Sequence, residues 1–239
     1  KGKFVVIDGI DGVGKSVFLN TFIAEAKKDG KRIFDVHQFW QNNNFHPSAQ
    51  EIICNYDIAI TSEPTFIGMG KLIREELIAK NQRNYSNNSV AEAYALDRRI
   101  LYEQLIIPLL EAGIDVYQSR SFSTSIVYQQ QTALDQNQDF SMQAILSIPG
   151  NKFCYEYPIN FLVIPTIVDV QEAIRRAQLR EKDDNCEFEN LDFQLKVKKH
   201  FESPEFKSIF EQKGTKLVYL DAGKTIEYSQ QQAQEFYEE

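Results

Sequence analysis

The sequence is poor in cysteine, in positive charge and in long apolar runs, and each shortage excludes a class of protein. Its 239 residues hold three cysteines, Cys54, Cys154 and Cys186, without a Cys-x-x-Cys pair or a histidine cluster, so we expect free thiols rather than a zinc site. Lysine and arginine number 26 against 34 acidic residues, and the net charge of −8 offers no general attraction to a nucleic acid polymer or an anionic membrane. No stretch approaches the roughly 18 apolar residues of a membrane span.

The start of the sequence also lacks the apolar core of a signal peptide, because Lys1, Gly2 and Lys3 run directly into an apolar strand pattern. Together with free thiols, this favours a cytoplasmic protein. Hydrophobic residues make up 43% of the chain, enough for a substantial core. Any anionic ligand must be held by local basic residues.

Short apolar runs alternate with amphipathic segments along the chain. We expect strands over residues 4–7, 31–36, 57–61, 115–118, 160–164 and 216–220. We expect helices over residues 17–28, 69–80, 90–112, 141–148, 170–180, 191–201 and 204–212, and in the tail. Such alternation implies right-handed crossovers and a mainly parallel sheet covered on both faces, so we predict a single three-layer α/β domain over residues 1–239. The polar region around 41–56 is expected to be an inserted surface loop, and the glutamine-rich residues 132–139 another loop.

One motif carries a specific chemical expectation. Residues 9–16, GIDGVGKS, match G-x-x-x-x-G-K-[ST] between a hydrophobic strand and an amphipathic helix, the setting of a phosphate-binding P-loop. Its glycines let backbone N–H groups face phosphate oxygens, and the helix N-terminus adds partial positive charge. We expect Lys15 to bridge the β- and γ-phosphates of ATP and the Ser16 hydroxyl to bind Mg²⁺. The expected ATP contacts are Gly9, Asp11, Gly12, Val13, Gly14, Lys15, Ser16 and Val17.

Further blocks follow the P-loop in a fixed order. They are EPTFIGMGKLIR from Glu63 to Arg74, YALDR at 94–98, SRSFSTSIVYQ at 119–129, and an arginine-rich segment that ends in Phe188-Glu189. With FVVIDGIDGVGKS at 4–16, these blocks resemble the thymidylate kinase family along almost the whole chain. The resemblance implies a P-loop kinase fold with a helical lid around 175–190. It also implies a homodimer that uses ATP and Mg²⁺ to phosphorylate a pyrimidine deoxynucleotide, with dTMP the expected acceptor and dTDP the product.

The resemblance also assigns roles to individual residues. Tyr94 would stack on the pyrimidine and Arg98 would reach its edge, while Arg74 and Arg120 would hold the 5′-phosphate. The expected acceptor-binding residues are Asp11, which would lie near the 3′-hydroxyl, together with Glu63, Arg74, Tyr94, Arg98, Arg120, Ser125, Tyr128 and Gln129.

The expected catalytic residues are Lys15, Arg120, Arg176 and Arg180. Arg176 and Arg180 lie one turn apart on one helix and would close over ATP. Arg175 precedes them on the same helix. Family members with glycine at the position of Gly12 usually carry their arginines in the lid, as this sequence does.

Two departures keep other functions open. Ser62 and Ser119 stand where the family often has arginine and aspartate, so metal binding would depend on Ser16, with Asp8 or Asp11 as a possible second ligand. One alternative is a deoxynucleoside kinase in which Glu63 acts as general base on a 5′-hydroxyl. The other is a catalytically weak protein in which ATP binding acts as a switch for a partner.

Overall fold

The fold is built on a parallel sheet, as the sequence predicts. The computed structural model describes residues 1–79, 81–179 and 190–238. All strand pairs of the six-stranded sheet are parallel, in the order β2-β3-β4-β1-β5-β6. The strands are β1 (Phe4–Ile7), β2 (Ile33–Asp35), β3 (Ile58–Ser62), β4 (Asp115–Ser119), β5 (Phe161–Thr166) and β6 (Lys216–Asp221).

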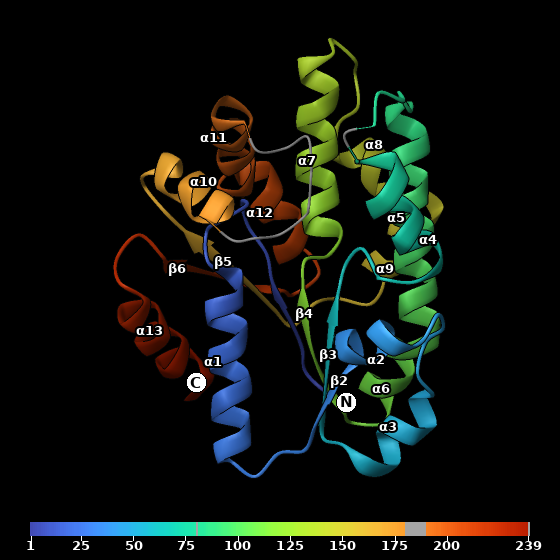
Figure 1. The fold of residues 1–239 in the computed structure, drawn as a ribbon, viewed down its shortest axis with the longest axis vertical. Helices are drawn as coiled ribbons and strands as arrows, with labels where there is room; N and C mark the ends of the chain where they lie inside the picture. The colour runs from blue at the N-terminus through green and yellow to red at the C-terminus, as the bar shows by residue number, and fades with distance from the viewer. Residues whose placement is uncertain (80, 180–189, 239) are drawn as a thin grey trace.

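Helices cover both faces of this sheet, which confirms the three-layer prediction. The first half of the chain contributes α1 (Lys15–Lys28), α2 (Val36–Asn42), α3 (Ala49–Asn55), α4 (Gly68–Leu72), α5 (Asn87–Leu101) and α6 (Ile107–Glu111). The second half contributes α7 (Phe122–Asp135), α8 (Met142–Leu146), α9 (Pro149–Tyr155), α10 (Val170–Leu179), α11 (Leu191–Phe201), α12 (Pro204–Glu211) and α13 (Ile226–Glu238). Figure 1 shows α1 and α13 side by side on one face, with α5 and α6 on the other.

The central strands place polar side chains at one edge of the sheet. All four residues of β1 are buried, as expected for a parallel strand covered on both faces. Because neighbouring parallel strands end at the same edge, Asp8 after β1, Glu63 after β3 and Arg120 after β4 come together there. The carboxyl edge of a parallel sheet is where α/β proteins usually bind ligands.

The region expected to be a loop around 41–56 is largely helical. Residues 41–42 end α2 and Ala49–Asn55 form α3, so residues 43–48 alone connect them. Asp35 caps α2 by accepting from the Gln38 N–H at 3.0 Å, and Ser48 caps α3 by accepting from the Glu51 N–H at 3.4 Å. These are ordinary N-cap residues, and they were the sequence signal for both helices.

Other differences are smaller. Helix α7 continues through Asp135, so the loop expected from residue 132 begins later. The expected helices 69–80 and 90–112 each contain a π-helical turn, η1 (Ile73–Leu77) and η2 (Tyr102–Ile106). The extra residue per turn changes which side chains face the core, and helical periodicity in a sequence does not reveal it.

Candidate functional site

The P-loop joins β1 to α1 as the motif predicts. Gly9, Gly12 and Gly14 all have positive φ, at 135°, 71° and 102°, a conformation that L side chains rarely adopt. The Lys15 ammonium donates to the Gly9 carbonyl at 3.1 Å and to the Ile10 carbonyl at 2.7 Å. Ser16 lies exposed in the first turn of α1. The glycine backbone and the helix N-terminus thus form a phosphate cradle with Lys15 folded over it.

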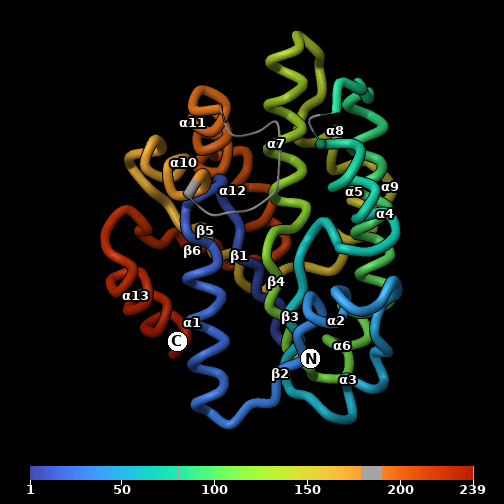
Figure 2. Tube along the Cα trace, viewed as in Figure 1, coloured from blue at the N-terminus to red at the C-terminus, as the bar shows by residue number. Residues whose placement is uncertain are grey.

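Gly12 is the point where α10 meets the P-loop. A Cβ atom on Gly12 would lie 1.8 Å from the Ala173 carbonyl oxygen and 3.1 Å from the Ala177 Cβ. Figure 2 shows α10 beside the loop that joins β1 to α1. This packing leaves no room for an arginine at position 12, which gives a physical reason for carrying arginines on α10 instead.

Asp11 links the P-loop to the segment after β4. Its carboxylate accepts hydrogen bonds from Arg120, from the Tyr128 hydroxyl at 3.1 Å and from the Gln194 side-chain amide at 3.1 Å. Burial by itself would raise the pKa of Asp11, but the charges of Arg120 and Lys15 and these hydrogen bonds outweigh burial and lower it. Asp11 is therefore held ionised between the two sides of the site.

Asp8 anchors the P-loop to α7. Its fully buried carboxylate accepts from the Gly9 N–H at 2.8 Å, from the Thr124 hydroxyl at 2.6 Å and from the Ser123 hydroxyl. Residues 1–79, 81–179 and 190–238 contain no group of three or more His, Cys, Asp and Glu side chains placed to hold a metal. Mg²⁺ commonly binds through one or two protein ligands together with phosphates and water, so the exposed Ser16 hydroxyl fits that mode.

Arg98 lies at the centre of a buried polar network. It is 1% exposed and donates from Nε to Glu63 at 2.6 Å, from Nη2 to the Ser125 hydroxyl at 2.8 Å and from Nη1 to Asn151. The Gln118 amide donates to the other Glu63 oxygen at 2.9 Å. Burial raises the pKa of Glu63 to about 7 even though Arg98 and Gln118 act in the opposite direction.

This network affects two of the sequence predictions. Both Glu63 oxygens are occupied and the side chain is 3% exposed, so its general-base role would require the pair with Arg98 to rearrange. To hydrogen-bond to a nucleotide base, Arg98 would likewise have to share the N–H groups that it donates to its three protein partners. Tyr94, half-buried one turn earlier on α5, stands in line with Arg98 along the helix.

Arg74 lies against the loop that follows β3. Its Nε donates to the Thr65 carbonyl at 3.2 Å and its Nη2 to the Pro64 carbonyl at 2.5 Å. Its guanidinium carbon lies 3.8 Å from the centre of the Phe66 ring. The other expected phosphate ligand, Arg120, is at the end of the neighbouring strand, so both arginines lie at the same edge of the sheet.

The arginines of α10 pair with an acid of their own helix. Arg175 Nε lies 2.6 Å and Arg176 Nε 2.9 Å from the Glu172 carboxylate. Arg176 also donates to the Ala222 carbonyl at 2.9 Å, which fastens α10 to the segment after β6. Arg180, Phe188 and Glu189, which the sequence places in the lid, lie outside the described residues.

Comparison with known proteins identifies the family. The family model described as "Thymidylate kinase" matches residues 49–233. The chain belongs to the thymidylate kinase family. The thymidylate kinase of Prochlorococcus marinus is 30% identical over 209 residues, covering 85% of this chain and 83% of its own length. The probable thymidylate kinase of Thermococcus kodakarensis is 27% identical over 205 residues, covering 83% and 82%.

A solved structure supports the fold. The structure of thymidylate kinase from Candida albicans matches with a TM-score of 0.66 at 20% identity, covering 100% of this chain and 92% of that one. Thymidylate kinases are phosphotransferases that use ATP with a divalent metal ion to convert dTMP to dTDP, and this chain is a member of the family. The fold and family implied by the sequence blocks are thereby confirmed. No helix in the described parts of this chain is long and apolar enough to span a membrane.

Sequence reasoning missed several polar residues of this candidate site. Gln194 on α11, Asn151 on α9 and Gln118 on β4 are each 0% exposed and bond to expected site residues. Each is a single amide in an otherwise ordinary helix or strand pattern. No signal in one sequence distinguishes such a residue from a solvent-exposed one.

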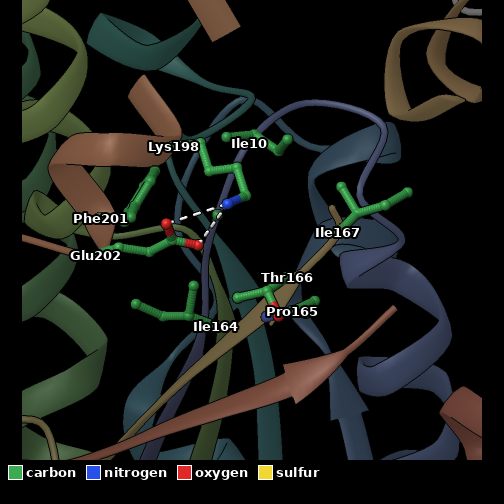
Figure 3. A pocket seen from close by; sticks show the side chains of 9 residues that line it. Ile10, Ile164, Pro165, Thr166, Ile167, Lys198, Phe201 and Glu202 are labelled. Atoms are coloured by element: carbon green, nitrogen blue, oxygen red, sulfur yellow. Dashed lines mark hydrogen bonds and ion pairs between the residues drawn. The ribbon is translucent and has the colours of Figure 1, made fainter. Parts of the chain in front are cut away.

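A small cavity behind the P-loop is not the nucleotide site. It lies between the end of β5 and α11, is lined by Ile10, Ile164 and Phe201 among others, and measures about 10 Å³ (Figure 3). Lys198 of α11 and Glu202, which follows α11, form an ion pair of 2.8 Å beside it. A space of this size holds about one water molecule, and its lining is apolar, so it belongs to the core.

Proposed function

We propose that this chain transfers the γ-phosphate of ATP to dTMP, giving ADP and dTDP. The observation that carries the proposal is the contact between Arg120 and Asp11. It joins a P-loop residue on the ATP side to a residue after the neighbouring strand β4 on the acceptor side. One half-buried cluster can therefore hold donor and acceptor in fixed relative positions, which is the main requirement of phosphoryl transfer.

On the donor side, the P-loop from Gly9 to Ser16 binds the phosphates of ATP, with Val13 and Val17 packed beside them. Lys15 turns from the Gly9 and Ile10 carbonyls to the β- and γ-phosphates. Mg²⁺, when bound, supplies positive charge that offsets the charge of the transferring phosphoryl group. The Ser16 hydroxyl would hold the ion, with Asp8 or Asp11 as the candidate second ligand.

On the acceptor side, Arg74 and Arg120 hold the dTMP phosphate and Tyr94 stacks on the thymine. Arg98 lies at the base edge, where Glu63, Asn151 and Ser125 fix its orientation. The remaining acceptor contacts are Asp11, Tyr128 and Gln129. The reaction needs no general base, because a monophosphate oxygen is already anionic near pH 7.

The α10 arginines complete the site by closing over ATP. Arg176 must first leave Glu172 and the Ala222 carbonyl. The sequence assigns Arg180 to the same lid. We also propose a single domain with a lid around 175–190 and an insertion around 41–56, assembled as a homodimer and active in the cytoplasm. Light scattering after size-exclusion chromatography would test the dimer.

ADP release from ATP with Mg²⁺ tests the proposed activity directly. The acceptors are dTMP, dUMP, dCMP and dGMP, each run beside its matching nucleoside. Turnover with dTMP supports the proposal, and removal of the metal with EDTA should abolish it. Turnover with thymidine or deoxycytidine would instead support Glu63 as general base. ATP binding without turnover on any acceptor would favour the switch function and contradict the proposal.

A further inference from the structure

The loop after β3 carries two residues, Thr65 and Phe66, against which Arg74 rests. Phe66 is 37% exposed, although aromatic side chains are usually more deeply buried. The Arg74 guanidinium lies 3.8 Å above the centre of its ring, a favourable cation–π distance.

The loop that carries Phe66 is rigid. Asp97 of α5 accepts two hydrogen bonds from Thr65, from its N–H at 2.8 Å and from its hydroxyl at 2.7 Å, and all three groups are buried. Helix α4 lies directly on the same loop, since a Cβ on Gly70 would come within 2.3 Å of the Thr65 carbonyl oxygen. The Pro64 and Thr65 carbonyls are therefore fixed acceptors for Arg74.

These contacts define the orientation of the Arg74 guanidinium. Two of its nitrogens donate along its edge, to Thr65 and Pro64, and its flat face rests on Phe66. Edge contacts alone allow a planar group to tilt about the line that joins the two acceptors. The ring face removes that freedom, so Phe66 determines the tilt.

Two aromatic residues of α2 pack against Phe66. The His37 ring centre lies 4.2 Å from that of Phe66, and the Trp40 ring centre lies 6.4 Å away. Trp40 is 4% exposed and packs edge-on against His46 at 5.7 Å. Helix α2 also packs against β3, which leads into the loop. A continuous set of rings thus connects residues 37–46 to Arg74.

We propose that Phe66 is a positioning residue for Arg74, and that His37 and Trp40 hold Phe66 in place. The proposal rests on the proposed function, in which Arg74 binds the acceptor phosphate. An arginine that is already oriented loses less rotamer freedom when the phosphate arrives, so acceptor affinity benefits. ATP, bound at the P-loop, should be unaffected.

Two substitutions at Phe66 distinguish a requirement for the aromatic ring from a requirement for apolar volume alone. Phe66→Leu keeps apolar volume but removes the ring, whereas Phe66→Tyr retains it. We expect Phe66→Leu to raise the KM for dTMP about three- to tenfold with little change in kcat or in the KM for ATP, and Phe66→Tyr to behave like wild type. Phe45→Ala is the matched control, because this exposed ring packs against Phe39 within the same segment. Phe45→Ala should leave kcat and the KM values for dTMP and ATP unchanged.

A double-mutant cycle tests whether Phe66 acts through Arg74. If it does, Phe66→Leu has no further effect on the KM for dTMP in an Arg74→Ala background. Equal effects in both backgrounds, an unchanged KM in Phe66→Leu, or an unchanged KM in Arg74→Ala would each overturn the proposal. Wild-type enzyme without dTMP turnover would refute the proposed function itself, so the two failures are distinguishable.

Discussion

Replacing Gly12 with alanine should lower the free energy of unfolding by more than the left-handed backbone conformation alone explains. Gly12 has φ of 71°, in the left-handed region, and its new Cβ would lie 1.8 Å from the Ala173 carbonyl oxygen. Ordinary van der Waals contact begins at 3.4 Å, so α10 must withdraw by more than an ångström. Neither the Ala173 carbonyl nor the Ala177 Cβ belongs to a flexible side chain that could rotate away.

Two contributions add up to the loss of stability expected for Gly12→Ala. The left-handed conformation costs a non-glycine residue about 1–2 kcal/mol. Withdrawal of α10 also strains the 2.9 Å hydrogen bond from Arg176 to the Ala222 carbonyl, which contributes about 1 kcal/mol. Gly30→Ala is the matched control, because its φ is 74° and its Cβ would meet nothing within 4 Å. Gly30→Ala should therefore show only the cost of the left-handed conformation.

Thermal unfolding and ADP release compare the stability and activity of Gly12→Ala with those of Gly30→Ala. We expect the Tm of Gly12→Ala to lie about 2–4 °C below that of Gly30→Ala, since 1 kcal/mol corresponds to such a shift at this chain length. The kcat of Gly12→Ala should fall by about tenfold or more, because displaced positioning groups are costly in phosphoryl transfer. Equal Tm and kcat in the two variants would refute the packing argument.

Three further predictions follow from the site. Lys15→Ala should abolish ADP release while the Tm and far-UV circular dichroism stay unchanged; retained turnover would rule out the P-loop role. Tyr94→Ala should raise the KM for dTMP about tenfold through lost stacking and leave that for ATP unchanged, whereas equal effects on both would contradict stacking. Because burial raises the pKa of Glu63 from 4.5 to about 7, folded protein keeps a proton that unfolded chain releases, so stability from this group falls as pH rises from about 4.5 through 7. Urea unfolding between pH 5 and 8 should show a shallower decline for Glu63→Gln, and identical slopes would exclude this titration.

The sequence by itself determined the P-loop and the layered architecture. The P-loop needs eight consecutive residues between a strand and a helix, so all its information is local. The alternation of apolar runs and amphipathic segments likewise determined a parallel sheet, and the expected strands agree with the observed ones to within two residues. The two short helices after β2 could have been predicted from their caps, Asp35 and Ser48.

Tertiary structure decided which polar residues meet. Gln194 bonds to Asp11 across 183 residues of sequence, and Arg98 donates to Glu63 just after β3, to Ser125 of α7 and to Asn151 of α9. A polar side chain has the same appearance in a sequence whether it faces water or a buried partner. Its environment is decided only when strand ends and helices converge at one edge of the sheet, because burial makes a matched partner obligatory there.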